Sequence, residues 1–189
     1  MNISYPYTIS NTHGEKLIFL GTESSPEGER VLVENFVAPG SGPPMHVHWQ
    51  QDESLTIVKG KMGYQVAGQP AQYAGEGETL LFKRGIAHRF WNAGEEVLNC
   101  KGWVNPANSI VFFLSAVYAA QNKSGKAQPE AFDAAYLLTQ YASEYTMVEI
   151  PYLVRKVIMP FTYQVGSLLG KYEHFQGAPA PLKTLRSRS

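Results

Sequence analysis

Three histidines and one glutamate occur at spacings that suit a metal site. His46, His48 and Glu53 lie within one short stretch, and His88 lies in a second stretch further along the chain. Imidazole nitrogens together with a carboxylate oxygen are suitable ligands for Fe(II), Mn(II), Ni(II), Cu(II) or Zn(II). We predict that these four side chains bind one divalent ion. Four protein ligands would leave two positions of an octahedral ion open, as substrate activation requires.

The spacing within the first stretch predicts the directions in which its ligand side chains point. Residues two apart on a β-strand point to the same side, so His46 and His48 can reach one point. Glu53 lies an odd number of residues from both histidines and would face the other side of an uninterrupted strand. The polar residues 50–52 favour a turn or bulge that brings Glu53 back to the site.

The second stretch predicts a turn followed by a strand. Gly85 marks the turn, and residues 86–92 form the strand, so that Phe90 lies on the same face as His88. Phe90 is therefore a candidate for lining a substrate pocket, with packing in the core as its alternative role. Tyr64 is a second candidate, although the pattern does not fix which face of its strand meets the cavity.

The two stretches resemble the two characteristic motifs of the cupin superfamily. Five positions match the first motif and four match the second: Gly40, His46, His48, Glu53 and Gly60, then Gly77, Gly85, His88 and Asn92. Lys83 stands where cupins usually carry proline, which leaves the rigidity of that turn open. The resemblance covers roughly residues 16–104. It implies a double-stranded antiparallel β-barrel, or jelly roll, with the metal inside it; the alternative is a barrel whose histidines only fill its interior.

Short apolar segments broken by glycine and polar turns favour an antiparallel barrel or sandwich. Residues 23–29, which include Pro26 and Gly28, predict a loop. We assign residues 1–104 to the barrel. The predicted strands cover residues 16–20, 30–37, 53–59, 61–66, 71–73, 79–82, 86–92 and 96–104.

After residue 104 the apolar pattern changes to the period of a helix. Asn108 or Ser109 is the expected cap of a first helix, residues 122–128 form a linker, and Pro129 suits the first turn of a second helix. The apolar face of that second helix would extend to Tyr145. Residues 105–175 are thus predicted to be a helical region that packs on the barrel as a scaffold, closes it as a lid, or forms a dimer interface.

A third helix should begin near Pro151 and end near Gly170, with a kink or break at Pro160. Its apolar positions are Val154, Val157, Ile158, Phe161, Val165 and Leu168. Residues 176–189 are predicted to be a disordered tail.

Composition narrows the setting in which the protein works. The 16 basic and 16 acidic residues balance, which favours neither nucleic acid nor an anionic membrane as a partner. The single cysteine, Cys100, fits a reducing compartment, and the N-terminus lacks the pattern of a secretory signal. The apolar run at 110–120 is shorter than the roughly 20 residues of a membrane span. We therefore expect a cytoplasmic protein that binds a small molecule, with a homodimer as one arrangement of its chains.

Three functions remain open at this point. The leading one is a metal-dependent oxidoreductase, most plausibly a dioxygenase, in which a small oxygenated organic substrate and O₂ take the two open positions. Glu53 would be a ligand and could also accept a proton as a catalytic residue. The alternatives are a metal-assisted isomerase or lyase, which needs no O₂, and a non-catalytic barrel that binds a small ligand. Protons should compete with the metal near and below the ordinary imidazole pKa of about 6.5.

Overall fold

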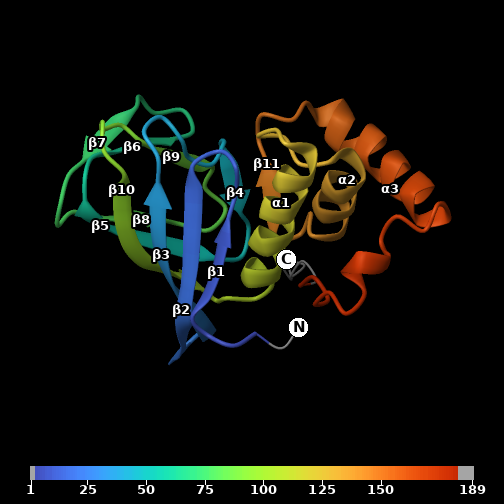
Figure 1. The fold of residues 1–189 in the computed structure, drawn as a ribbon, viewed down its shortest axis with the longest axis horizontal. Helices are drawn as coiled ribbons and strands as arrows, with labels where there is room; N and C mark the ends of the chain where they lie inside the picture. The colour runs from blue at the N-terminus through green and yellow to red at the C-terminus, as the bar shows by residue number, and fades with distance from the viewer. Residues whose placement is uncertain (1–2, 183–189) are drawn as a thin grey trace, which may run out of the picture.

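Two antiparallel β-sheets face each other and are followed by helices (Figure 1). The computed structural model describes residues 3–182. The first sheet has the order β1 (Tyr7–Ser10), β2 (Glu15–Ser25), β3 (Gly28–Val37), β10 (Leu98–Asn105), β5 (Asp52–Lys59) and β8 (Thr79–Phe82). The second has the order β11 (Tyr145–Met147), β4 (His46–His48), β9 (His88–Asn92), β6 (Met62–Val66) and β7 (Gln72–Ala74).

The core lies between these sheets and confirms the predicted mainly-β jelly-roll class. Alternate residues of the strands point inward, as the burial of Leu55 and Ile57 on β5 and of Leu98 and Cys100 on β10 shows. Each of these four side chains is at most 1% exposed. The apolar pattern with period two therefore predicted the correct class of sheet.

Two parts of the first sheet differ from the prediction. The loop predicted at residues 23–29 is mostly strand, because β2 continues to Ser25 and β3 begins at Gly28. The polar side chains at this end of the β2–β3 hairpin face solvent. Backbone hydrogen bonds between the two strands therefore stabilise it, although neither of its faces is buried. The strand β1 was not predicted; it is short and pairs only with β2.

The helices follow the barrel closely in sequence. They are α1 (Ile110–Ser124), α2 (Ala131–Gln140), a π-helical segment η1 (Val154–Ile158) that continues into α3 (Met159–Leu168), and the short 3₁₀-helix η2 (Glu173–Phe175). Within the part of the chain that the structure describes, no helix is long and apolar enough to cross a membrane.

The helix ends correct several predicted details. Ser109 precedes α1 as expected, but its hydroxyl makes no capping hydrogen bond. Instead of a linker from residue 122, α1 runs to Ser124 and ends at Gly125, whose φ is 66°. Pro129 lies before α2 rather than in its first turn, because the carboxylate of Glu130 caps that helix by accepting a bond from the Asp133 backbone N–H.

A further correction concerns Tyr145, which was predicted on the second helix. That helix ends at Gln140, and Tyr145–Met147 forms β11 beside β4. The backbone of β11 pairs with the edge of β4, and this pairing outweighs the helical period of the side chains. A segment from the predicted helical region therefore completes the second sheet.

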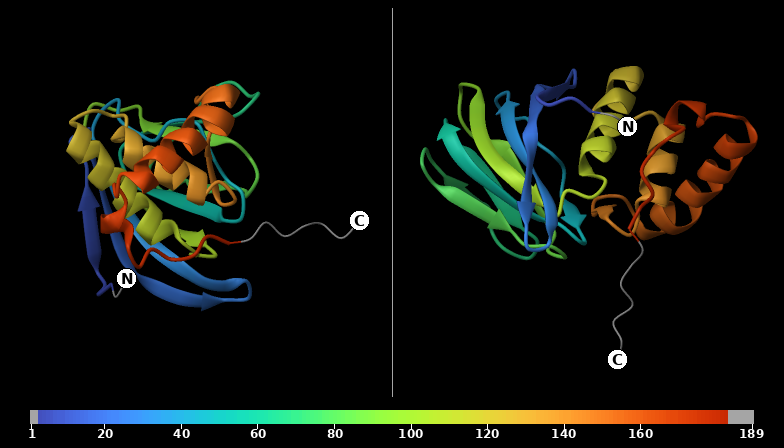
Figure 2. Two further views of the ribbon diagram at one scale, coloured as in Figure 1. Left: turned by 90° about the vertical axis from the view of Figure 1, so that its right-hand side faces the viewer. Right: turned by 90° about the horizontal axis from the view of Figure 1, so that it is seen from below.

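The helices form layers beside the barrel. Figure 1 shows α1 next to the strands, α2 beyond it and α3 outermost, and the two further views in Figure 2 agree. Ile110, Phe113 and Leu137 belong to the same apolar cluster as the barrel interior. The predicted tail is described only to residue 182. In its described part, the Pro179 carbonyl accepts a hydrogen bond from the hydroxyl of Tyr141, which follows α2. Residues 183–189 lie outside the described part.

Candidate metal centre

The four predicted ligands meet inside the barrel. One potential ligand atom from each of His46, His48, Glu53 and His88 lies within 4.8 Å of the others, and all four side chains are buried. Glu53 Oε2 is 3.3 Å from His88 Nε2 and 3.7 Å from His48 Nε2. The rings of His46 and His88 are 4.6 Å apart. This convergence unites residues that are up to 42 positions apart in the chain.

Both sheets contribute to the cluster. His46 and His48 lie on β4, and His46 is paired directly with His88 on β9, so the three imidazoles share one face. Glu53 lies on β5 in the facing sheet. The turn predicted at residues 50–52 thus acts by leading the chain from one sheet to the other, where the inward face of β5 points back at the histidines.

Backbone carbonyls fix the orientation of two rings. His46 Nδ1 donates to the Pro44 carbonyl at 2.8 Å, and His88 Nδ1 donates to the Ile86 carbonyl at 2.9 Å. Because a carbonyl oxygen can only accept, the hydrogen must reside on Nδ1, which leaves each Nε2 lone pair for a metal. These contacts are the kind that orient histidine ligands in known metal sites. The donor set therefore fits one divalent ion.

The electrostatics favour the same conclusion. Burial and the neighbouring histidines lower the pKa of His46 to about 4 and that of His48 to about 3. Burial opposes ionisation of Glu53, but the contact with His88 and the charges of the neighbouring histidines lower the pKa of Glu53 to about 2. At neutral pH the cluster thus offers neutral His46 and His48 and an ionised carboxylate, the forms that bind metals.

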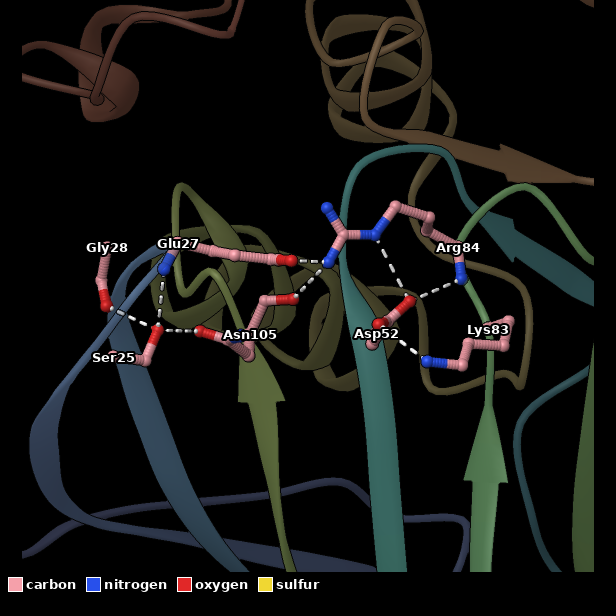
Figure 3. Close-up of polar contacts among 7 residues, drawn as sticks. All are labelled: Ser25, Glu27, Gly28, Asp52, Lys83, Arg84 and Asn105. Carbon is pink, nitrogen blue, oxygen red and sulfur yellow. Dashed lines mark hydrogen bonds and ion pairs between the residues drawn. The ribbon is translucent and has the colours of Figure 1, made fainter.

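The turn that lacks the usual proline is held by ion pairs instead (Figure 3). Asp52 accepts hydrogen bonds from the Arg84 backbone N–H at 2.8 Å, from Arg84 Nε at 3.1 Å and from Lys83 Nζ at 3.3 Å. Arg84 also pairs with Glu27 of the β2–β3 turn. Lys83 therefore takes part in a polar clamp where proline would stiffen the chain.

This clamp acts next to the cluster. Asp52 immediately precedes Glu53, and the Gly85 backbone N–H donates to the His48 carbonyl at 2.7 Å. The turn at residues 83–85 is thus tied to both ligand-bearing strands β4 and β5. Its rigidity, left open by the sequence, follows from these contacts.

The two predicted pocket residues lie on β9, the strand that carries His88, and on its neighbour β6. Phe90 is 5% exposed and belongs to the apolar core, and Tyr64 is paired with it on β6. Tyr64 donates to Gln72 Oε1 at 2.8 Å, and its ring meets that of Phe82. Their role as substrate-pocket residues stays a prediction.

Phe82 was missed by the sequence reasoning. Its ring stacks on His88 at 4.3 Å with an interplanar angle of 4°, and it is paired with Glu53 across β5 and β8. Strand parity was the available signal, because residues 79–82 were already predicted to be a strand. Phe82 therefore forms an apolar wall beside two of the proposed ligands.

The strand β11 brings two more residues to the site that sequence reasoning missed. Tyr145 is paired with His48 and Met147 with His46, so both share the face of the ligands. The Tyr145 ring meets the His48 ring edge-on, with centroids 5.5 Å apart. A three-residue strand inside a helical region carries no period that could have identified them.

A buried polar network supports Tyr145. Glu144, which is fully buried, accepts hydrogen bonds from Gln51 Nε2 at 2.9 Å and from the Leu182 backbone N–H at 3.0 Å. Gln51 Nε2 and Ser109 Oγ each lie 3.2 Å from the Tyr145 hydroxyl. The network connects the turn before β5, the start of α1 and β11 beside the histidines of β4.

Metal retention should persist to a lower pH than ordinary imidazoles would allow. Protons reach His46 and His48 only near their lowered pKa values of about 4 and 3. The unfolded chain takes up these protons below about pH 6.5, so the free energy of unfolding of the metal-free protein should fall between pH 6.5 and about 4. Metal content and urea unfolding, measured at a series of pH values, check both statements. Loss of half the metal at about pH 6.5 would contradict the lowered pKa values.

Comparison with known proteins supports an assignment to a family. Residues 35–101 match the family model of the cupin domain. The probable oxidoreductase virH of Hypocrea virens is 31% identical over 77 residues, which are 40% of this chain and 34% of that protein. The oxidoreductase iacF of Pestalotiopsis fici is 31% identical over 125 residues, which are 58% of this chain and 61% of that protein. The chain thus spans about a third of the length of virH and about three-fifths of the length of iacF.

Solved structures with a similar fold share little sequence with this chain. A Klebsiella pneumoniae protein with a double-stranded β-helix domain is 20% identical with a TM-score of 0.46, covering 54% of this chain and 85% of that one. KdgF from Halomonas is 13% identical with a TM-score of 0.44, covering 52% and 86%. The match to the cupin-domain model, together with the two motifs and the two facing antiparallel sheets, supports the assignment of residues 35–101 to the cupin superfamily.

Proposed function

We propose that this protein is a metal-dependent oxidoreductase of the dioxygenase type that acts on a small oxygenated organic molecule. The observation that carries the proposal is the buried convergence of three imidazoles and one carboxylate. The names of the two curated relatives, both oxidoreductases, support the same class. A bound Fe(II), Mn(II), Ni(II) or Cu(II) ion would supply redox chemistry and positions for substrate oxygen and O₂.

The side chains have distinct roles in this proposal. His46, His48 and His88 hold the ion through Nε2, and Glu53 holds it through a carboxylate oxygen. With a divalent ion the site has a formal charge near +1, which attracts an ionised enol, catechol or diketone. The low pKa of Glu53 keeps its carboxylate ionised for the metal but also makes it a weak base, so accepting a proton from the substrate is its secondary role.

Apolar groups beside the ligands would limit the access of water. Phe82 stacks on His88, and Tyr145 packs edge-on against His48. Tyr145 is 3% and Phe82 is 4% exposed. Such walls strengthen the electrostatic contacts of a bound substrate and exclude competing hydrolysis.

An oxygen-electrode screen tests the reaction type. Protein reconstituted separately with Fe(II), Mn(II), Ni(II), Cu(II) or Zn(II) is mixed with enol, catechol or β-diketone compounds. At least one redox-active form should consume O₂, whereas the Zn(II) form should not, because Zn(II) has no redox chemistry. His48→Ala serves as the inactive variant, and His174→Ala, outside the cluster, serves as the matched control.

Two other outcomes would replace the proposal. Equal turnover under strict anaerobiosis with Zn(II) would indicate a metal-assisted isomerase or lyase. Saturable binding of these compounds without turnover by any metal form would indicate a non-catalytic binding protein.

A further inference from the structure

The outermost helix presents an apolar face to solvent. Six large side chains of η1, α3 and their flanks are between 48 and 89% exposed and form what we call the α3 patch: Leu153, Val157, Ile158, Phe161, Leu168 and Leu169. In the left view of Figure 2, α3 lies in front of the other helices, on the side away from the barrel. The apolar stripe predicted for the third helix is thus mostly exposed. None of the described residues covers it.

The opposite face of α3 is fixed against α2 and cannot be exchanged for the patch. Tyr163 accepts a hydrogen bond from Gln140 Nε2 at 2.6 Å, and its ring stacks on Tyr172 at 5.3 Å. A Cβ at Gly166 would lie 2.2 Å from the Tyr172 hydroxyl oxygen, so this face needs glycine for its close approach. Rotation of the helix would break these contacts. The α3 patch therefore stays exposed in the described part of the chain.

We propose that the α3 patch binds the α3 patch of a second copy of this chain, with the two helices antiparallel. Apolar positions recur on both sides of Phe161: Leu153 and Leu169 each lie eight residues from it, and Val157 and the half-buried Val165 each lie four residues from it. A two-fold axis at Phe161 would set Leu153 against Leu169 of the other copy, and the reverse contact would follow by symmetry. The centre and both ends of the patch would thus meet apolar side chains of the second copy.

The size of the patch favours a second copy, and its small number of basic residues does not favour an anionic membrane. The exposed apolar area of the six side chains is on the order of 700 Å², close to the roughly 800 Å² that each partner buries in a standard interface. Such an area exceeds the few hundred Å² usual for a patch on a monomer. Helices that lie on anionic membranes have a polar face rich in Lys and Arg. Here residues 151–172 contain only Arg155, Lys156 and Lys171, and Lys171 already lies over the Phe132 ring.

Light scattering coupled to size exclusion tests the dimer with the full chain. The wild type should have twice the mass of one chain at micromolar concentration, and Phe161→Glu should have the mass of one chain. Ser167→Glu adds the same charge at an exposed position outside the patch and should remain dimeric. Because Phe161 is 66% exposed, its variant should keep the circular dichroism spectrum and metal content of the wild type.

Cysteine cross-linking tests the orientation of the helices. Phe161→Cys lies on the proposed axis and should form a disulfide-linked dimer under mild oxidation, since Cα atoms must be within about 7 Å. Leu153→Cys alone should not, because the antiparallel arrangement separates its two copies. Efficient cross-linking of Leu153→Cys would contradict this arrangement.

Three results would overturn the proposal. The first is a wild type that stays monomeric at tens of micromolar, and the second is a dimer that survives Phe161→Glu. The third is a monomeric wild type that binds phosphatidylserine-containing vesicles through Phe161, which would assign the patch to a lipid surface. The dimer does not depend on the proposed reaction, because the α3 patch lies apart from the metal ligands.

Discussion

The His46→Ala/His48→Ala double variant should lose nearly all bound metal while its barrel remains folded. Two of the three imidazoles disappear from a cluster whose ligand atoms lie within 4.8 Å of one another. Loss of a residue that merely orients a ligand already weakens metal binding 10–100-fold, so loss of two ligands should weaken it by more than about 100-fold. Elemental analysis after reconstitution and desalting measures the change directly.

A histidine outside the cluster provides the matched control. His174 lies on the surface, where its Nε2 is 3.0 Å from Asp133 Oδ1, and His174→Ala should retain the full metal content. Circular dichroism should show the same β-sheet signal in all three proteins. Equal metal content in the wild type and the double variant would show that these residues only fill the barrel interior.

The sequence predicted which four side chains meet in the cluster because part of their arrangement depends on local rules. His46 and His48 are two residues apart on one strand, so strand parity alone aims them together. The position of Glu53 was harder to explain. A turn was predicted correctly, but the reason it works is that β5 belongs to the facing sheet. Only the pairing of distant strands determines which sheet each strand joins.

The residues behind the cluster could not be predicted for the same reason. Tyr145 reaches His48 because β11 satisfies an open strand edge that is nearly 100 residues away in sequence. Its own neighbourhood has the composition of a helix end, so local propensity gave the wrong element. The hairpin arm at residues 23–29 is a similar case, since backbone pairing outweighs a Pro- and Gly-containing sequence.

The third helix shows what a periodic pattern can establish. Its apolar stripe was identified from spacing, but spacing does not tell whether a stripe meets the same chain or another one. In this structure the face of α3 that carries Tyr163 and Gly166 packs closely on the neighbouring elements, and the apolar stripe therefore stays mostly exposed. A pattern thus predicts the existence of an apolar face, and only packing decides its partner.

The largest effect on stability is expected for Glu144→Ala. This carboxylate is fully buried and accepts hydrogen bonds from Gln51 Nε2 and the Leu182 backbone N–H, with the Ser109 N–H at 3.5 Å. Removing it leaves Gln51 Nε2 with only the Tyr145 hydroxyl at 3.2 Å, and it takes the acceptor from the buried Ser109 N–H and the partly buried Leu182 N–H. A buried donor that loses its acceptor costs about 1–3 kcal/mol, so the free energy of unfolding should fall by about 3 kcal/mol. With a slope of about 2 kcal/mol per molar urea, the unfolding midpoint should shift down by about 1.5 M.

The measurement is best made on metal-free protein, because a bound ion would add its own binding energy to the folded state. Glu149→Ala is the matched control: it removes an exposed carboxylate just after β11, whose only described side-chain contact is a 3.4 Å bond from the Met45 N–H. That variant should change stability by less than about 0.5 kcal/mol. The stability of Glu144→Gln, which keeps an acceptor oxygen in place, should fall between those of the two alanine variants.

Because Tyr145 packs on His48, Glu144→Ala should also weaken metal binding, whereas Glu149→Ala should not. If Glu144→Ala unfolded at the same urea concentration as Glu149→Ala, the buried network would not be what holds β11 against β4.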